Sequence, residues 1–502
     1  MPFSFTYNNS GVNFTYPQFT FNISPSYKGF TLYLGQHSMQ FSQYVYSIPA
    51  TGIGLEYQGK NIRAGAFCGQ LRKAINDDPT DPLARNPQYS RYGWGVKAGY
   101  GTSNRYIDIY VFHASDRIGS IDSRWYGKVS PMDNLVIGAK GRFAYKRFAI
   151  SANAAMSVFT EDTNSDPLPE DVIGGWGKIF DARMTSYYRF AGDANASYGI
   201  KNFNFMAQFK IVQPNYKTLG TNYISNNVMS FGGAVSGSLF KGRMNISANF
   251  SKQRDNLTKE QLYTTSGYVY SATLSLRIIN GLQFNAAYNG YKQVQSDGTA
   301  IVNDSVKVDR TMHSVTGSLN YSLRTGLINH AMGVSHSFNK NIDNNPYNGH
   351  ASDVMTNATG VNYTMGITPI KITLNFGYNH QSSGTTDRKF TTDMFTFGTS
   401  RSFLSDGSLR FSLTASYSKN KNDDTTNNSF GVSLSGAYTL KQAHQFSLAA
   451  AYNKNGQTIL ENNLPKRTGG YGYSLSLNYS YSFVLLHIKK KVKEAQMQAQ
   501  AQ

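Results

Sequence analysis

The stretch YGYSLSLNYSYSF, Tyr471–Phe483, places its apolar and polar residues on alternate positions. The odd positions hold five aromatic rings around two leucines: Tyr471, Tyr473, Leu475, Leu477, Tyr479, Tyr481 and Phe483. The even positions hold small polar residues: Gly472, Ser474, Ser476, Asn478, Ser480 and Ser482. Because successive side chains of a strand point to opposite faces, this segment predicts a strand with one apolar and one polar face.

The same alternation recurs at 244–250, 370–378, 409–417 and 446–453. Each apolar stripe is flanked by Ser, Asn, Thr and Gly, and the strands are longer than the roughly five or six residues usual in soluble proteins. Aromatic residues gather at the ends of the stripes. These features favour strands that cross a membrane.

The connections between the predicted strands are of two kinds. Short turns are expected at 58–60, 101–104, 145–147, 200–202, 241–243, 280–281, 324–326, 368–369, 405–408 and 441–443. Long polar loops are expected at about 38–51, 73–90, 115–133, 160–183, 214–226, 254–266, 294–310, 340–352, 382–391, 420–427 and 456–469. With a strand near 29–37 and the final strand, the ten hairpins predict 22 strands, within a range of 20–24.

A sheet in lipid must close on itself, because no water is present to pair with its edges. The sequence therefore predicts an all-β fold, a transmembrane antiparallel up-and-down β-barrel with short periplasmic turns and long extracellular loops. A soluble sandwich also alternates apolar and polar residues, and a propeller has a similar repeat length. The strand length and the aromatic stripe ends disfavour the sandwich. The two-strand repeat disfavours the propeller.

Composition agrees with this class. Aromatic residues make up 14% of the 502 residues, Tyr occurs 35 times and Gly 46 times, and mean hydropathy is −0.41. The net charge is +19, but most Lys and Arg are scattered, which disfavours a nucleic-acid groove. We expect the partners to be outer-membrane lipid and lipopolysaccharide, with possible protein partners in an envelope complex and no nucleic acid.

Three segments are expected along the chain. Residues 1–28 predict a strand or hairpin, either two more wall strands or a link to a missing domain, and 29–484 predict the barrel. Residues 485–502 predict a basic helical tail, which is either in part a non-native addition or a periplasmic helix or lumen insert that contacts a partner. No signal peptide is recognisable at the start, and Cys68 is the single cysteine, so no disulfide is expected.

The segments SPSYKGFTLYLGQHSMQFSQY (Ser24–Tyr44) and RAGAFCGQLRKAI (Arg63–Ile75) resemble large outer-membrane barrels of the Bacteroidota. This resemblance implies a subunit of an export, assembly or uptake machine, and no functional residue is carried over from it. A barrel of this size also resembles TonB-dependent transporters. Those carry a large plug domain before the first strand, for which the residues before 29 leave no room.

The sequence does not indicate an enzymatic activity. The nine histidines are dispersed and none lies in a recognisable catalytic or zinc motif, so we expect no enzyme, no cofactor and no metal. Two acidic loop clusters, Asp77, Asp78 and Asp81, and Asp343, His350 and Asp353, offer oxygen ligands to calcium. Their spacing matches no calcium loop, and Asp is common in turns.

The function predicted from these features is an outer-membrane β-barrel that serves as a subunit, scaffold or solute channel of a Gram-negative envelope complex. A stand-alone porin-like channel for passive diffusion is the alternative, and an outer-membrane enzyme is a weaker one. The predicted inward faces are mostly small and neutral, which favours a scaffold or a loop-plugged barrel.

Three groups of residues are predicted to matter. Residues predicted to face the lumen are Lys371, Arg410, Ser412, Ser474, Ser476, Asn478 and Ser480. The lipid-facing aromatic girdle is predicted at Tyr471, Tyr473, Tyr479, Tyr481 and Phe483. The locally acidic loop 160–183 is predicted to fold inward or to contact a partner through Asp166, Glu170, Asp171 and Trp176.

Overall fold

The structure is a computed structural model, and it describes residues 3–8, 11–15, 22–76, 87–169, 180–349, 352–385, 388–404, 407–423, 425–440, 444–461 and 464–481. These residues form antiparallel strands with three short 3-10 turns at Ser123–Trp125, Phe240–Gly242 and Asp304–Val306. In this part of the chain no helix is long and apolar enough to cross a membrane.

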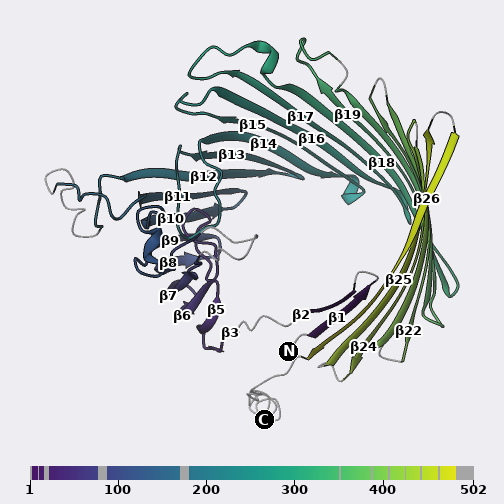
Figure 1. The fold of residues 1–502 in the computed structure, drawn as a ribbon, viewed down its shortest axis with the longest axis horizontal. Coiled ribbons are helices and arrows are strands. Elements are labelled where there is room, and N and C mark those ends of the chain that lie inside the picture. The colour runs from purple at the N-terminus through teal and green to yellow at the C-terminus, as the bar shows by residue number, and fades with distance from the viewer. Residues whose placement is uncertain are drawn as a thin grey trace. The chain divides into compact units, whose positions relative to one another are not determined.

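The strands follow one another along the chain and most are connected to their neighbours as hairpins (Figure 1). Their bounds are β1 (Phe3–Asn8), β2 (Gly11–Thr15), β3 (Asn22–Ile23), β4 (Ser26–Tyr27), β5 (Phe30–His37), β6 (Ala50–Gln58), β7 (Ile62–Arg72), β8 (Arg91–Thr102), β9 (Arg105–Asp116), β10 (Asp133–Tyr145), β11 (Phe148–Thr160), β12 (Ser186–Ile200), β13 (Phe203–Val212), β14 (Val228–Leu239), β15 (Met244–Asp255), β16 (Tyr263–Ile279), β17 (Leu282–Asp297), β18 (Asp309–Thr325), β19 (Ile328–Asp343), β20 (Val354–Ile367), β21 (Ile372–Gly384), β22 (Lys389–Phe403), β23 (Leu409–Lys421), β24 (Thr425–Leu440), β25 (His444–Glu461) and β26 (Leu464–Tyr481).

The predicted fold class, an all-β barrel of antiparallel up-and-down strands, is confirmed. The strands β5 to β26 correspond one by one to the 22 predicted strands, and each of the ten predicted short turns lies between two of them. The hairpin of β1 and β2 adds two strands, since β1 pairs with β26 from Phe3↔Tyr479 to Asn8↔Ser474. The remaining two strands, β3 and β4, have two residues each.

Three of the predicted long loops are wrong in extent. The segments 382–391, 420–427 and 456–469 belong mostly to strands, and β25 and β26 reach 18 residues each. Their Asn, Thr, Gln and Lys residues stay in register with neighbouring strands, for example Gln457 with Asn427 and Thr468. Polarity in these segments therefore marks the end of the apolar stripe and not the end of the strand.

The described chain divides into two compact units, with the division falling inside β18 and β19. Unit 2 comprises 19–317 and 337–355, and unit 1 comprises 1–18, 318–336 and 356–502. In unit 2 the strands β5 to β17 form one continuous antiparallel ladder. The buried apolar core of the described chain lies in this unit.

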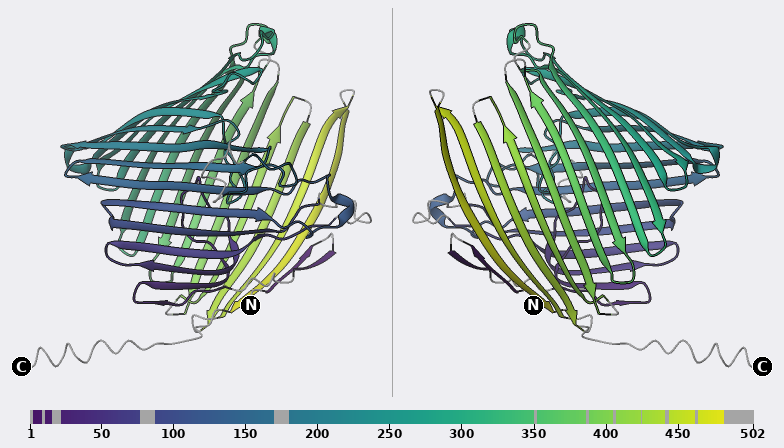
Figure 2. Two further views of the ribbon diagram at one scale, coloured as in Figure 1. Left: turned by 90° about the vertical axis from the view of Figure 1, so that its left-hand side faces the viewer. Right: turned by 90° about the vertical axis from the view of Figure 1, so that its right-hand side faces the viewer.

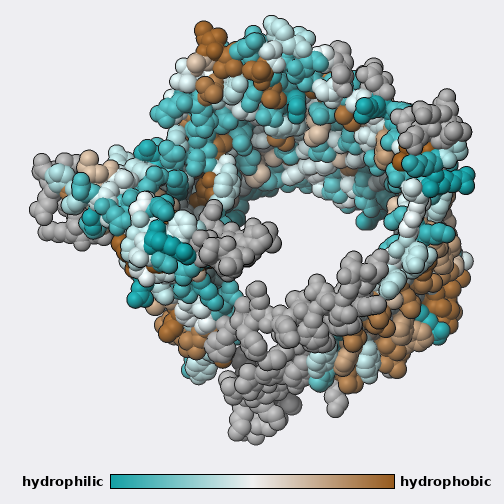
Figure 3. Space-filling view, viewed as in Figure 1, coloured by the Kyte–Doolittle hydropathy of each residue, from teal (hydrophilic) through white to brown (hydrophobic). Residues whose placement is uncertain are grey.

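In unit 1 the strands β21 to β26 continue the alternation of apolar and polar residues that the sequence shows. The long ribbons of β22 to β26 run side by side in Figure 2. Hydrophobic surface covers these strands in Figure 3, at the lower right of the view. Because β26 pairs with β25 on one side and β1 on the other, neither edge of the last strand is free.

The acidic turn at Asp343 orders its own loop. Its carboxylate accepts hydrogen bonds from the Asn345 backbone N–H (3.0 Å), Asn348 Nδ2 (3.0 Å) and Ser352 Oγ (3.2 Å). Asp343 therefore acts here as a turn residue. His350 and the other predicted calcium cluster, Asp77, Asp78 and Asp81, lie outside the described residues. Within the described residues, no group of three or more His, Cys, Asp or Glu side chains gathers.

Candidate functional site

Two long loops of unit 2, residues 38–49 and 213–227, fold over one face of its sheet. We call this the covered face. Met39, Tyr44, Val45 and Tyr46 from the first loop, and Tyr216 and Leu219 from the second, are almost completely buried. They pack on side chains of the wall: Phe67, Tyr110, Phe112, Val136, Ala155, Phe159, Ala191, Val212 and Val228. The loops and the wall thus share one apolar core, and the loops are fixed in place.

Hydrogen bonds join the two loops to each other. Tyr216 Oη donates to the Tyr44 carbonyl (2.7 Å) and Thr218 Oγ1 donates to the Val45 carbonyl (3.0 Å). The Ser47 backbone N–H donates to the Gly220 carbonyl (2.8 Å). Burial raises the pKa of the Tyr46 and Tyr216 hydroxyls above the usual tyrosine value, which keeps both groups neutral.

Further hydrogen bonds join the loops to the strands beneath them. The Leu219 N–H donates to Asn134 Oδ1 (3.0 Å), and Ser157 Oγ donates to the Lys217 carbonyl (2.6 Å). Ser42 Oγ donates to Asn153 Oδ1 at 2.8 Å. Since loop backbone groups are satisfied by buried wall side chains, the docked position is specified by polar as well as apolar contacts.

Gly220 stands where the two loops meet, and its lack of a side chain permits the contact. A Cβ atom there would overlap the Val45 carbonyl oxygen and lie 2.9 Å from the Phe112 ring. We expect Gly220→Val to undock the second loop at a cost of about 1–3 kcal/mol, as in other overpacked cores. Limited proteolysis by trypsin at Lys217 should become faster in this variant.

A matched control for this prediction is Asn222→Val, which adds the same side chain at an exposed position of the same loop. Cleavage at Lys217 should remain at the wild-type rate in Asn222→Val. Equal protection of Lys217 in both variants would show that the loop is not held by the Gly220 contact.

Beside the docked loops, the covered face carries ion pairs. Arg63 on β7 reaches Asp108 on β9 (2.8 Å) across Gly99 of β8, where any Cβ would overlap the Asp108 carboxylate. Lys97 pairs with Glu56 and also donates to the Gln40 carbonyl of the first loop (3.1 Å). These pairs connect β6 to β9.

A second group of charges on the covered face has no such partners. Lys140 and Arg142 lie on β10 and Lys210 lies on β13. They share a face with Gly138, whose Cβ would contact Val45 of the first loop, and with Val212 of the core. In the part of the chain that the structure describes, these three side chains form no ion pair or side-chain hydrogen bond.

The register places these cations in two neighbouring rows just beyond the docked loops. One row runs Asp108–Lys140–Asn153–Asp193–Lys210, and the next row holds Arg142 between Tyr106 and Ser151. Asp108 is engaged by Arg63, and Asp193 accepts from Gln43 of the first loop (3.2 Å). The rows therefore present three free cations against the single carboxylate of Asp193.

The sequence reasoning missed this charged region, because it assigned residues to the inward face only in a few strands with clear apolar stripes. The signal is present in β10, where Val136, Gly138, Lys140 and Arg142 alternate with Leu135, Ile137, Ala139 and Gly141. The first half of β10 is apolar on both faces, because the loops cover the face that carries Val136. The alternation that identifies lipid-facing strands is therefore weak in β10.

The residues predicted to face the lumen belong to unit 1. Arg410 and Ser412 lie on the face of β23 opposite Phe411 and Leu413, and Ser412 Oγ is 2.6 Å from Ser435 Oγ. The remaining wall residues share the polar face of β26: Ser474, Ser476, Asn478 and Ser480. That these residues line a solute path stays a prediction.

Lys371 is placed differently from the expectation. It lies in the turn before β21 with φ of 51°, and its Nζ donates to the Leu404 carbonyl of a neighbouring turn (3.0 Å). Three residues after Thr368 the chain is still completing the hairpin, so β21 begins two residues later than the alternation at 370–378 indicates. Lys371 is a turn residue and not part of the wall.

The predicted girdle lies on the apolar face of β26. Tyr471 and Tyr473 are exposed. Tyr479 packs on Phe446, with ring centroids 4.8 Å apart, and its hydroxyl forms a hydrogen bond with His444 Nδ1 (2.8 Å). Tyr481 is described only as part of the strand, and Phe483 lies outside the described residues. The role of these rings at a membrane interface remains a prediction.

The described ends of loop 160–183 pack on the face opposite the covered face. Leu168, Phe180 and Ala182 contact Leu135, Val111 and Val158, which alternate with the core residues of the covered face. Asp166 is exposed, and its carbonyl accepts from the Met184 N–H (2.9 Å). Glu170, Asp171 and Trp176 lie outside the described residues, so a contact with a partner stays a prediction.

The face opposite the covered face is apolar and exposed along the strands of unit 2. It includes Tyr92, Trp94, Val96, Tyr100, Ile107 and Ile109. Unit 1 shows a second such face, with Phe376, Phe395, Phe411, Phe430, Leu448 and Leu475. A contiguous apolar surface of this extent is favourable in contact with lipid and unfavourable in contact with water. Since sheets that span lipid are β-barrels of the outer-membrane type, the protein is an outer-membrane β-barrel.

Comparison with known proteins adds little to this geometry. No protein-family model matches the sequence, and no curated protein matches it. The similar solved structures include OccK8 (OprE) of Pseudomonas aeruginosa, with 12% identity over 79% of this chain and 98% of that chain and a TM-score of 0.35. They also include OpdK of Pseudomonas aeruginosa, with 10% identity, 70% and 94% coverage and a TM-score of 0.35.

A BenF-like porin from Pseudomonas fluorescens Pf-5 is similar at 10% identity, with 70% of this chain and 92% of that chain covered and a TM-score of 0.34. Similarity at these TM-scores carries no argument about function, which rests on the residues described above. The resemblance to barrels of the Bacteroidota stays a prediction.

Proposed function

We propose that the protein is a channel through which small polar solutes cross the outer membrane by passive diffusion, with a preference for anions. The observation that carries the proposal is the covered face of unit 2, where Lys140, Arg142 and Lys210 stand unpaired beside two docked loops. Loops that fold onto the inner side of a channel wall narrow the solute path, and free charges beside them select ions by sign.

The polar face of unit 1 supports a wet interior. Arg410, Ser412, Ser474, Ser476 and Asn478 offer hydroxyl, amide and guanidinium groups to water, on the side opposite the lipid-facing residues. Side chains of this kind hydrogen-bond passing solutes without holding them tightly. The region beside the docked loops would then supply the selectivity.

The experiment is single-channel recording of the purified protein in planar lipid bilayers, together with an analysis of what co-purifies. We expect discrete conductance steps and a zero-current potential under a KCl gradient that reports anion preference. A protein that is electrically silent, and that carries stoichiometric partner proteins, would instead be a scaffold subunit of an envelope complex.

A further inference from the structure

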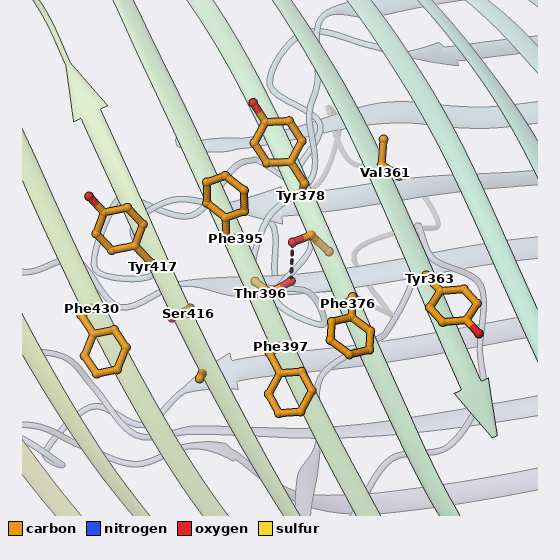
Figure 4. Close-up of a pocket in the computed structure, with 12 residues that line it drawn as sticks. Val361, Tyr363, Phe376, Tyr378, Phe395, Thr396, Phe397, Ser416, Tyr417 and Phe430 are labelled. Carbon is orange, nitrogen blue, oxygen red and sulfur yellow. Dashed lines mark hydrogen bonds between the residues drawn. The ribbon is translucent and has the colours of Figure 1, made fainter. Parts of the chain in front are cut away.

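An aromatic row crosses the exposed apolar face of unit 1. Register places Tyr378 of β21 beside Phe395 of β22, then Tyr417 of β23 and Phe430 of β24. Figure 4 shows these rings standing on successive strands. The row lies on the long-loop side of a stripe that includes Phe376 and Phe397, and Tyr378 and Phe395 pack with ring centroids 4.8 Å apart.

Below this row the face is hollowed. A groove of about 510 Å³ lies between the rings, with Val361, Tyr363, Phe376 and Phe397 along its walls. Ala415 contributes little bulk on this face of β23, which leaves the depression among larger neighbours. The groove is open and lined mainly by carbon, so an acyl chain fits its chemistry.

Beyond the aromatic row, the same face becomes basic. Lys419 and Lys421 follow Tyr417 on β23, and Arg467 lies on β26 in the same row as Lys421. Lys454 of β25 stands at the end of the aromatic row itself, in register with Phe430 and Tyr471. All four side chains are exposed. Within the described residues none of them forms an ion pair or a side-chain hydrogen bond.

Asp393, a carboxylate beside these cations, is already engaged. Asp393 is in register with Lys419, and its Oδ1 accepts from Tyr378 Oη (2.9 Å) and lies 2.8 Å from His380 Nδ1. The face therefore offers three cations without an ion pair, then an aromatic row that ends at Lys454, and then an apolar groove. This is the order of groups in a phosphorylated lipid that lies in the outer leaflet, with its phosphate outermost and its acyl chains below.

We propose that this face binds a phosphorylated outer-leaflet lipid. Lys419, Lys421 and Lys454 would hold the phosphate, and the groove beside Ala415 would hold an acyl chain. The proposal rests on the proposed function and on the predicted orientation of the barrel, in which the long loops are extracellular. A free anion would bind the cations alone, whereas the apolar groove below the aromatic row favours an amphiphile.

The test is native mass spectrometry of the full chain in detergent micelles that contain diphosphoryl lipid A. We expect retained lipid A adducts in the wild type and an affinity at least about ten-fold lower in Lys419→Gln/Lys421→Gln/Lys454→Gln, since each surface cation contributes to phosphate binding. Ala415→Trp, which fills the groove, should weaken lipid A binding while leaving the cations in place.

Arg324→Gln/Lys371→Gln is the matched control. It removes two cations of the same unit whose side chains bond turn carbonyls, and it should bind lipid A like the wild type. Equal lipid A binding by the lysine variant and the wild type would overturn the proposal. Full displacement of lipid A by millimolar inorganic phosphate would instead assign the cations to free anions and would also overturn it.

Single-channel recording on the same preparations separates the two proposals. The lysine variant should keep the wild-type conductance while it loses lipid A. A wild type that conducts ions but retains no lipid A would leave the channel function intact and reject the lipid site alone.

Discussion

Replacing residues 214–226 with a short Gly-Ser linker is expected to raise single-channel conductance at least about two-fold, because a constriction dominates the resistance of a wide pore. This segment supplies Tyr216, Thr218, Leu219 and Gly220, which pack and hydrogen-bond on the covered face. Its removal also frees the loop 38–49 from four hydrogen bonds. The measurement is the unitary current in planar bilayers.

The matched control deletes residues 299–303 from another long loop of unit 2. That segment contains Ile301, which is 94% exposed and packs on nothing in the core. Its deletion should leave conductance unchanged. An unchanged current after replacement of 214–226, in a protein whose strand content by circular dichroism equals that of the wild type, would show that the docked loops do not constrict the path.

The second large effect concerns ion selectivity. Lys140→Glu/Arg142→Glu/Lys210→Glu should reverse the sign of the zero-current potential under a ten-fold KCl gradient. The change replaces three unpaired cations with three carboxylates next to Asp193. Low-dielectric walls focus the electric field of such charges into the solute path, where it acts strongly on passing ions. The neutral variant, with Gln at the three positions, should lie between the two.

Lys146→Gln/Lys201→Gln/Lys241→Gln serves as the control for charge. These three lysines lie in short turns of the same unit, each with positive φ, and away from the docked loops. Their loss changes the net charge by the same amount as the neutral variant. If both neutral variants moved the potential equally, selectivity would follow the overall charge of the protein and not the rows beside the loops.

Much of the architecture was predictable because lipid imposes a simple pattern. Alternation of Tyr, Leu and Ser in 471–483, together with Asn-Gly and Asp-Gly turns, is sufficient to find the strands and their order. Strand length was predicted less well. Asn427 and Gln457 remain paired in the sheet beyond the apolar stripe, and a polar residue in an exposed strand resembles a loop residue in sequence.

The candidate site was not predictable in the same way. The sequence MQFSQYVY of the first loop, 39–46, lies in a segment predicted as a long polar loop, yet its apolar residues pack on Phe67 and Phe112. Packing between segments more than a hundred residues apart leaves no periodic signal. Ser42 and Asn153, which form a buried hydrogen bond, are ordinary loop and strand residues when each is considered alone.

The ladder between β1 and β26 has a consequence for how the protein assembles. Phe3 pairs with Tyr479, so this seam joins residues from the two extremes of the chain. Contacts between such distant residues form slowly, since closing a long loop costs conformational entropy before any hydrogen bond is gained. The seam should therefore form last, after the intervening hairpins are in place. Until then β26 has an open edge to which a folding factor or a second chain can add a strand.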